Sequence, residues 1–154
     1  MTFRDANPND SQSIAGLINL AFQVERFFIE TDRITRGEVE SLQGTGSFLL
    51  AEDDRGLAGC VYLELRGERA YFGLLSVDPS RQRTGLGRLL ITAAEDRARA
   101  AGCRFMDLQT VNLREELLPI YRKFGYRESG TAPFPCFVST KIPCHFILMS
   151  KALD

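Results

Sequence analysis

Residues 77–90 read Val-Asp-Pro-Ser-Arg-Gln-Arg-Thr-Gly-Leu-Gly-Arg-Leu-Leu, and they carry the strongest structural signal in the chain. The apolar run from Tyr71 to Val77 predicts a strand before them, and the amphipathic run from Leu86 to Ala101 predicts a helix after them. The first turn of a helix offers unpaired backbone N–H groups and the positive end of the helix dipole. Glycine lets an anion approach that backbone closely, and arginine adds charge. The segment therefore predicts a site for phosphate or pyrophosphate.

Three kinds of phosphate-binding loop compete for this segment. A P-loop requires lysine and then serine or threonine directly after its last glycine, but Arg88 follows Gly87. A dinucleotide-binding loop requires a third glycine where Leu90 stands. The third pattern, Gln/Arg-x-x-Gly-x-Gly/Ala, is met by Gln82, Gly85 and Gly87. An ordinary strand–loop–helix connection with surface arginines remains the alternative to all three.

Length and composition limit the class of protein. A chain of 154 residues suits one domain with a real core, and 44% apolar with 25% charged residues is typical of soluble globular proteins. The net charge of −1 argues against a nucleic-acid partner, although Arg81, Arg83 and Arg88 form a local cluster suited to one small polyanion. No apolar run resembles a membrane span or a signal peptide. We therefore expect a cytoplasmic protein with no membrane partner.

The four cysteines predict neither a metal site nor a disulfide framework. Cys60, Cys103, Cys136 and Cys144 form no C-x-x-C pair, and the chain has a single histidine, His145. A zinc site would need ligands without a recognisable spacing. Free, mostly buried thiols are the expected state in a reducing cytosol.

Periodicity and turn residues predict a mixed order of strands and helices along the chain. The first helix follows Asp10 as its N-cap, and the helix after the glycines is expected to bury Leu89 and Leu90. Asn112 and Glu115 have the spacing of a capping box. The expected strands are 2–5, 47–52, 58–65, 71–77, 105–111, 126–131 and 144–149, and the expected helices are 11–22, 35–42, 86–101 and 119–124.

This order, the loop of residues 77–90 and the sequence Ile-Tyr-Arg-Lys-Phe-Gly-Tyr at Ile120 to Tyr126 resemble the GNAT family of N-acetyltransferases. The resemblance implies one acetyltransferase domain over residues 1–154 with an α/β (α+β) fold. Its centre would be a mixed, mostly antiparallel sheet of about seven strands flanked by about four helices. One strand pair would be splayed to admit the cofactor.

The resemblance implies acetyl-CoA as the co-substrate and no metal. The pantetheine arm would lie along a bulged strand, where Gly73 fits a bulge or a close approach. The pyrophosphate would bind the backbone of the loop and the first helical turn. The residues expected to bind acetyl-CoA are Leu75, Ser76, Val77, Gln82, Arg83, Thr84, Gly85, Leu86, Gly87, Arg88 and Asn112.

The family's general acid corresponds to Tyr121, although flanking apolar residues also allow a plain core role. A phenol can donate a proton to a leaving thiolate. Many relatives take the base from a glutamate on the bulged strand, but Tyr71 to Val77 contains no carboxylate. Glu64 on the neighbouring strand is the first substitute, followed by Glu25 and Glu30.

The acceptor is expected between the early helices and the later strands, with Glu25, Phe28, Arg33 and Tyr62 as candidate contacts. It would be a small-molecule amine or a peptide or protein amine, which the enzyme would bring to attack the thioester directly. Family members are commonly dimers, so a homodimer is also allowed, although no residue indicates one. The alternatives are a non-catalytic acyl-CoA sensor on the same fold and a dinucleotide-dependent oxidoreductase.

Overall fold

The structure is a computed structural model that describes residues 1–154. The strands are β1 (Thr2–Asp5), β2 (Ser47–Asp53), β3 (Gly56–Arg66), β4 (Arg69–Val77), β5 (Phe105–Val111), β6 (Arg127–Pro133) and β7 (His145–Ala152). The α-helices are α1 (Ser11–Ala21), α2 (Arg36–Gln43), α3 (Leu86–Ala100) and α4 (Leu117–Lys123). Short 3₁₀ helices are η1 (Pro8–Asp10), η2 (Phe22–Phe27) and η3 (Pro79–Arg81). This order of elements confirms the one expected from the sequence.

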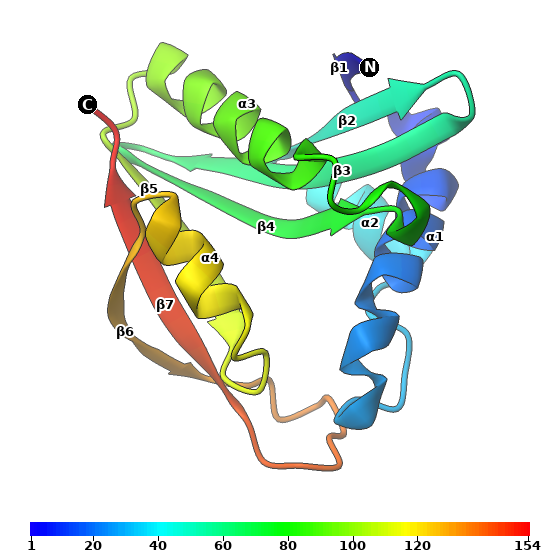
Figure 1. Ribbon diagram of the computed structural model, residues 1–154, viewed down its shortest axis with the longest axis vertical. Helices are drawn as coiled ribbons and strands as arrows, with labels where there is room; N and C mark the ends of the chain where they lie inside the picture. Colours follow the sequence, from blue (N-terminus) through cyan, green and yellow to red (C-terminus); the bar gives the residue numbers. More distant parts are fainter.

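All seven strands form one sheet in the order β1-β2-β3-β4-β5-β7-β6 (Figure 1). Every neighbouring pair is antiparallel except β4 and β5, which run parallel. The α/β fold with a mixed, mostly antiparallel sheet is therefore confirmed.

The parallel pair separates soon after it begins. β4 and β5 pair only over residues 69–71 and 105–107, and beyond this point the two strands diverge (Figure 1). A bulge in β4 lies next to the split: Gly73 pairs with Tyr62 and Ser76 with Cys60, so two residues of β4 face one of β3. Leu74 within the bulge has φ +53°, a conformation that is rare for leucine. The expected splayed pair and its bulge are both present.

Helices cover both faces of the sheet. Helix α3 packs on one face through Leu86, Leu90 and Ala94, whereas α1 and α2 pack on the opposite face around Ile14 and Val39. The expectation that Leu89 is buried was wrong, because its side chain is 51% exposed. Leu86 and Leu90, four residues apart, occupy the buried stripe, and Leu89 lies about 100° away from Leu90.

Two expected helix caps differ in the structure. Asp10 stands at the N-cap position of α1 as expected, but its side chain makes no cap bond there and instead joins Asn7 in the capping box of η1. The Asn112–Glu115 box does not form: α4 begins at Leu117, and Asn112 Oδ1 instead accepts the backbone N–H of His145 at 2.8 Å. Asn112 therefore links the end of β5 to the start of β7.

The wide end of the split is closed by two segments from opposite ends of the chain. Ile29, just after η2, forms an isolated β-bridge with Thr140 in the β6–β7 loop, and Lys141 donates its N–H to the carbonyl of Phe28 at 2.8 Å. Figure 1 shows η2 and this loop meeting below the split. No helix is both long enough and apolar enough to cross a bilayer, and the four cysteines are free thiols.

Candidate functional site

Arg81 braces the loop between β4 and α3. Its guanidinium is buried, with Nε and Nη2 each donating to Asp53 at 2.7 Å and Nη1 donating to Asp78 at 3.0 Å. The Arg81 guanidinium in turn lowers the pKa of Asp53 to about 2. The expected cluster of three anion-binding arginines was therefore wrong in one member, because Arg81 is committed to two carboxylates.

The loop presents a run of free backbone N–H groups. None of the N–H groups of residues 82–88 donates to another group of the protein, and the first bond of α3 joins Leu89 N–H to the Gly85 carbonyl at 3.1 Å. Arg83 and Gly85 both have left-handed backbones, with φ of +66° and +80°. Such a turn, followed by a helix N-terminus, is a concave anion site.

Gly87 is not required by packing within the protein. A Cβ added there would meet only Val77, at 3.9 Å. Its φ also lies outside the left-handed range, so alanine would fit the helix. The space in front of Gly87 is therefore open for a ligand to approach the backbone.

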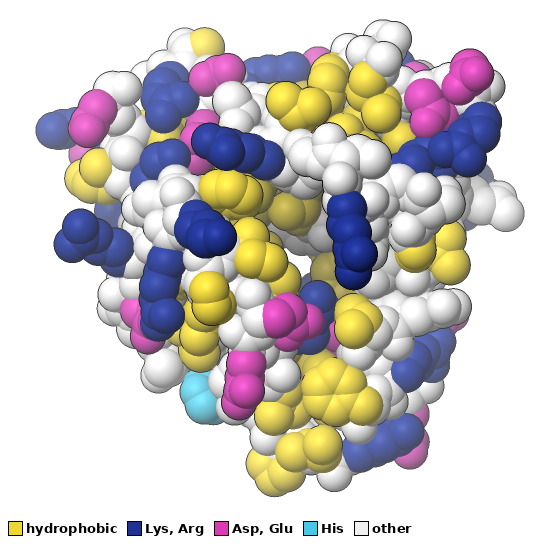
Figure 2. Space-filling view, viewed as in Figure 1, with side chains coloured by type: hydrophobic (Ala, Val, Ile, Leu, Met, Phe, Trp, Pro, Cys, Tyr) yellow, Lys and Arg dark blue, Asp and Glu magenta, His cyan; other side chains and the backbone are white.

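This loop forms one wall of a cavity of about 790 Å³, here called the loop cavity, which also contacts the β4 bulge, the end of β5, Tyr121 and Phe134. Figure 2 shows a hollow at the centre of this face, bordered by apolar, basic and acidic side chains. Of the residues expected to bind acetyl-CoA, those that line it are Leu75, Val77, Gln82, Arg83, Gly85, Leu86, Gly87 and Arg88.

Three of the expected cofactor residues have side chains committed elsewhere. Ser76 is buried and donates to the Leu74 carbonyl at 3.0 Å, and Thr84 donates to the Arg81 carbonyl at 2.7 Å. The Asn112 amide oxygen accepts from His145, as described above. None of the three lines the loop cavity, and of their side-chain donors only Nδ2 of Asn112 makes no bond to the protein.

Tyr121 on α4 faces the loop cavity. Its ring packs against Phe72 and Tyr126, with ring centres 6.2 and 6.3 Å away. The hydroxyl makes no hydrogen bond to the protein, yet no fully buried side-chain oxygen lacks a partner, so this oxygen reaches the cavity. Burial raises the pKa of Tyr121 to about 12, opposed by the nearby Arg114.

Glu25 on η2 also lines the loop cavity, although it is only 8% exposed. Arg114 Nη1 donates to its carboxylate at 2.9 Å, and Arg114 Nε donates to Glu116. Burial raises the pKa of Glu25, and Arg114 opposes that rise. The sequence did not indicate Arg114, because its partner lies 89 residues earlier in the chain.

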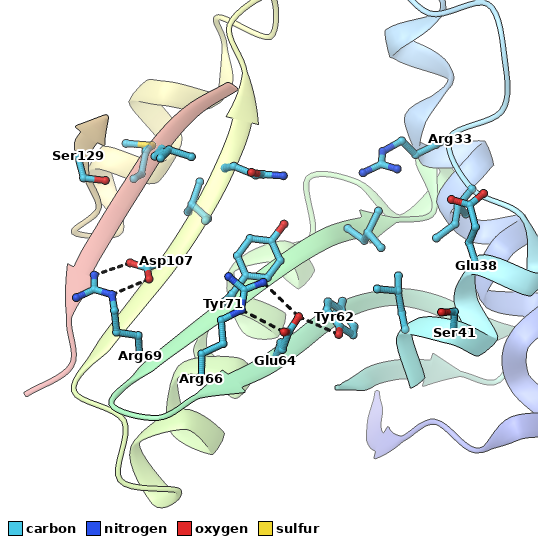
Figure 3. A pocket seen from close by; sticks show the side chains of 17 residues that line it. Arg33, Glu38, Ser41, Tyr62, Glu64, Arg66, Arg69, Tyr71, Asp107 and Ser129 are labelled. Carbon is cyan, nitrogen blue, oxygen red and sulfur yellow. Dashed lines mark hydrogen bonds and ion pairs between the residues drawn. The ribbon is translucent and has the colours of Figure 1, made fainter. Parts of the chain in front are cut away.

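A second cavity of about 710 Å³, here called the sheet cavity, lies on the α2 side of the sheet (Figure 3). Glu64 lies here rather than beside Tyr121, and its carboxylate accepts bonds from the Tyr62 hydroxyl and Arg66, both at 3.1 Å. The bond from Arg66 lowers the pKa of Glu64, which makes that carboxylate a weaker base. The two expected catalytic side chains therefore face different cavities.

Tyr71 stands between the two cavities and lines both. A Cβ added at Gly73 would come within 2.6 Å of the Tyr71 hydroxyl, so glycine there leaves room for the Tyr71 ring to fold over β4. Burial raises the pKa of Tyr71, opposed by Arg33 and Arg66. Since Leu108 and Gln109 of β5 also line both cavities, the two spaces meet at the split between β4 and β5.

The four residues expected to contact the acceptor do not share one surface. Glu25 lines the loop cavity, Tyr62 lines the sheet cavity and Arg33 lines both. Phe28 was wrongly expected at the site: it is 0% exposed and packs with Ile29 and Val111 beneath the cavity wall. No group of three or more His, Cys, Asp or Glu side chains is placed to hold a metal ion.

Comparison with known proteins assigns the family. Residues 13–126 match the model of the acetyltransferase (GNAT) family. This range covers most of the chain and includes strands β4 and β5, where the two cavities meet. The chain therefore belongs to the GNAT acetyltransferase family, as the sequence resemblance indicated.

Among curated proteins, the chain is 34% identical over 107 residues to the mycothiol acetyltransferases of Clavibacter michiganensis subsp. michiganensis and Clavibacter sepedonicus. These matches cover 66% of this chain and 35% of each relative, so the chain spans about a third of the length of these relatives.

Solved structures share the fold at lower sequence identity. An aminoglycoside 6'-N-acetyltransferase complexed with coenzyme A has a TM-score of 0.78 at 20% identity, covering 100% of this chain and 98% of that one. Nourseothricin acetyltransferase has a TM-score of 0.78 at 20% identity, covering 99% and 98%. Ard1 from Thermoplasma volcanium has a TM-score of 0.80 at 19% identity, covering 99% and 97%.

Proposed function

We propose that residues 1–154 form one acetyl-CoA-dependent N-acetyltransferase domain, which moves an acetyl group to a primary amine by direct attack on the thioester. One observation carries this proposal. The loop cavity brings together the free N–H groups of residues 82–88, the unpaired side of β4 beyond the split, and a Tyr121 hydroxyl without a protein partner. Membership of the GNAT family supports the same reaction.

The loop cavity offers binding groups for two parts of acetyl-CoA, the pyrophosphate and the pantetheine arm. The N–H groups of residues 82–88 would bind the pyrophosphate, while Arg83 and Arg88 add charge that no carboxylate of the protein neutralises. Beyond the split β5 no longer pairs with β4, so the backbone from Leu75 to Val77 can pair with the pantetheine arm as a further strand would. The bound acetyl-CoA supplies an acetyl group activated as a thioester.

Tyr121 would act as the general acid. Because burial raises its pKa to about 12, the phenol is protonated at neutral pH and can donate to the sulfur that leaves. Its hydroxyl reaches the cavity on the α4 side, where no protein acceptor competes for the proton.

Two carboxylates are candidates for removing the proton of the amine. Glu64 faces the sheet cavity and is held by Arg66 and Tyr62, which lower its basicity. Glu25 faces the same cavity as Tyr121, and burial raises its pKa. We favour Glu25 as the base, because a pKa closer to neutral makes a better proton acceptor at working pH.

The acceptor would enter from the sheet cavity and meet the thioester at the split, past Arg33 and Tyr62. The similarity to mycothiol acetyltransferases and to an aminoglycoside 6'-N-acetyltransferase supports a small-molecule amine as the acceptor. A cytoplasmic location is part of the proposal, and the four free thiols support it.

Release of the coenzyme A thiol from acetyl-CoA, measured at pH 8 across a broad panel of amines, tests this function. We expect release that depends on one class of amine and saturates with acetyl-CoA. Tight binding of acetyl-CoA, with no release of the coenzyme A thiol that depends on any amine of the panel, would instead favour the non-catalytic sensor.

A further inference from the structure

The sheet cavity contains three arginines, and two of them are neutralised by acidic neighbours. Arg66 donates to Glu64 at 3.1 Å, and Arg69 donates two bonds to Asp107 at 2.8 and 2.7 Å. Arg33 forms no ion pair and no hydrogen bond, although it lines the same cavity. The cavity therefore offers one uncommitted guanidinium.

Arg33 is held where a ligand can use it. The side chain of Asn19 bonds both the N–H and the carbonyl of Ile34, at 3.0 and 2.9 Å, which fixes the backbone beside Arg33. The guanidinium carbon lies 5.6 Å from the centre of the Phe22 ring. Figure 3 shows the Arg33 side chain reaching into the cavity toward Tyr71. A group bound to Arg33 would thus lie beside the strand split.

The unpaired charges of the cavity match a zwitterion. Glu38 lines both cavities and has no cationic partner. Its carboxylate accepts only the backbone N–H of Thr35, in the α2 capping box. A polyamine or an aminoglycoside would bring additional positive charge beside Arg33. An acceptor that carries one ammonium and one carboxylate would add no net charge to the cavity. A guanidinium binds a carboxylate through two parallel hydrogen bonds, which also fixes its orientation.

We propose that the acceptor is an amino acid whose carboxylate binds Arg33, so that its amine lies at the split between β4 and β5. The proposal rests on the proposed acetyltransferase activity and names the substrate class for that site. Arg33 is then a specificity-determining residue. The other two arginines of the cavity, Arg66 and Arg69, are neutralised by their ion pairs with Glu64 and Asp107.

The test compares the twenty proteinogenic amino acids with their carboxamides as acceptors, since only the acid of each pair carries the carboxylate that Arg33 would bind. For the best pair we expect the wild type to prefer the acid. Arg33→Gln should lower kcat/KM for the acid by about 10- to 100-fold, mainly through KM, and should change the carboxamide little. Arg36→Gln is the matched control, because Arg36 lies outside both cavities and pairs with Glu40 on the surface of α2.

Calorimetric binding of the same pairs to the coenzyme A-loaded protein separates this proposal from the proposed function. Binding that requires both the carboxylate and Arg33, without turnover, would support Arg33 as the carboxylate site and would refute the proposed acetyltransferase activity. Two outcomes would refute the Arg33 site while leaving the acetyltransferase activity in place. One is turnover with no preference for the acid, and the other is an equal effect of Arg33→Gln on both members of every pair. Absence of any carboxylate dependence in both measurements also overturns it.

Discussion

Burial shifts the pKa values of Tyr121 and Glu25, which line one cavity, in the direction that suits the opposite tasks proposed for them. Burial disfavours the charged form of each group, so both pKa values rise. For a phenol the rise secures the proton that an acid must give. For a carboxylate it strengthens the ability to take one. Arg114 opposes both shifts and holds the carboxylate of Glu25 in place.

Tyr121→Phe tests the acid directly. The ring contacts with Phe72 and Tyr126 remain, and the lost hydroxyl has no protein partner, so stability should change little. We expect acetyl-CoA affinity within a few-fold of the wild type and kcat lower by about 10²-fold or more. Calorimetry and initial rates measure the two quantities. Equal turnover by the variant and the wild type would reject the role.

Glu25→Gln and Glu64→Gln together identify the base. If Glu25 removes the proton, activity requires its ionised form, and its raised pKa places the acidic limb of the pH–rate profile above 4.5. Activity should therefore fall as the pH drops through that limb, and Glu25→Gln should lower kcat by about 10²-fold and abolish the limb. Glu64→Gln should keep the limb. A profile that loses its limb only in the Glu64 variant would reverse the assignment.

At the scale of elements, different residues of the connection between β4 and α3 stabilise the loop and face the proposed ligand. Asp53 and Asp78 hold Arg81 inside, and the N–H groups that follow are left free. The same division applies to the glycines: Gly85 is needed for its left-handed backbone, whereas Gly87 faces open space.

Gly87→Ala should therefore separate folding from cofactor binding. Alanine is the better helix former, so the melting temperature should stay equal or rise slightly. The added methyl would occupy the approach to the loop N–H groups, and we expect acetyl-CoA affinity to fall by about tenfold or more. Gly16→Ala on α1, where an added Cβ would meet nothing within 4 Å, is the control and should leave affinity unchanged. Unaltered affinity in the Gly87 variant would place the pyrophosphate elsewhere.

The sequence predicted those features that depend on local patterns. Periodicity and turn residues located the seven strands and four α-helices but not the 3₁₀ helices, and the spacing of Gln82, Gly85 and Gly87 indicated the anion loop. Features that depend on distant partners were not predictable. Arg81 is paired with Asp53, 28 residues earlier, so its burial could not be distinguished from surface charge.

Other errors in the candidate site have the same origin. Phe28 is buried by the β6–β7 loop and the end of β5, which no local pattern records. Tyr71 reaches its position only because Gly73 leaves space for its ring on the same strand face, and the sequence assigned Gly73 to the bulge alone.

At the scale of the whole molecule, the sheet is two parts joined at three residue pairs between β4 and β5. β1 to β4 with α1, α2 and α3 form one part, and β5 to β7 with α4 form the other (Figure 1). A ligand that lies in the split and contacts both parts should stabilise the whole fold, because it binds the native state alone.

Thermal unfolding measures this effect and distinguishes two classes of cofactor. At a concentration 100 times its dissociation constant, acetyl-CoA should add about 2.7 kcal/mol and raise the melting temperature by about 5–10 °C. NAD at the same concentration should give no shift, because Leu90 stands where a dinucleotide loop needs glycine. Protection by NAD alone would favour the oxidoreductase alternative.

The closure of the split by η2 and the β6–β7 loop has a consequence for how this protein can diverge. These segments join through the Ile29–Thr140 bridge and the bond from Lys141 to Phe28, and they stand apart from the loop that follows β4. The β6–β7 loop also lies beyond residue 126, where the family match ends. Insertions or substitutions there can reshape one wall of the loop cavity while the loop after β4, with its free N–H groups, is inherited unchanged.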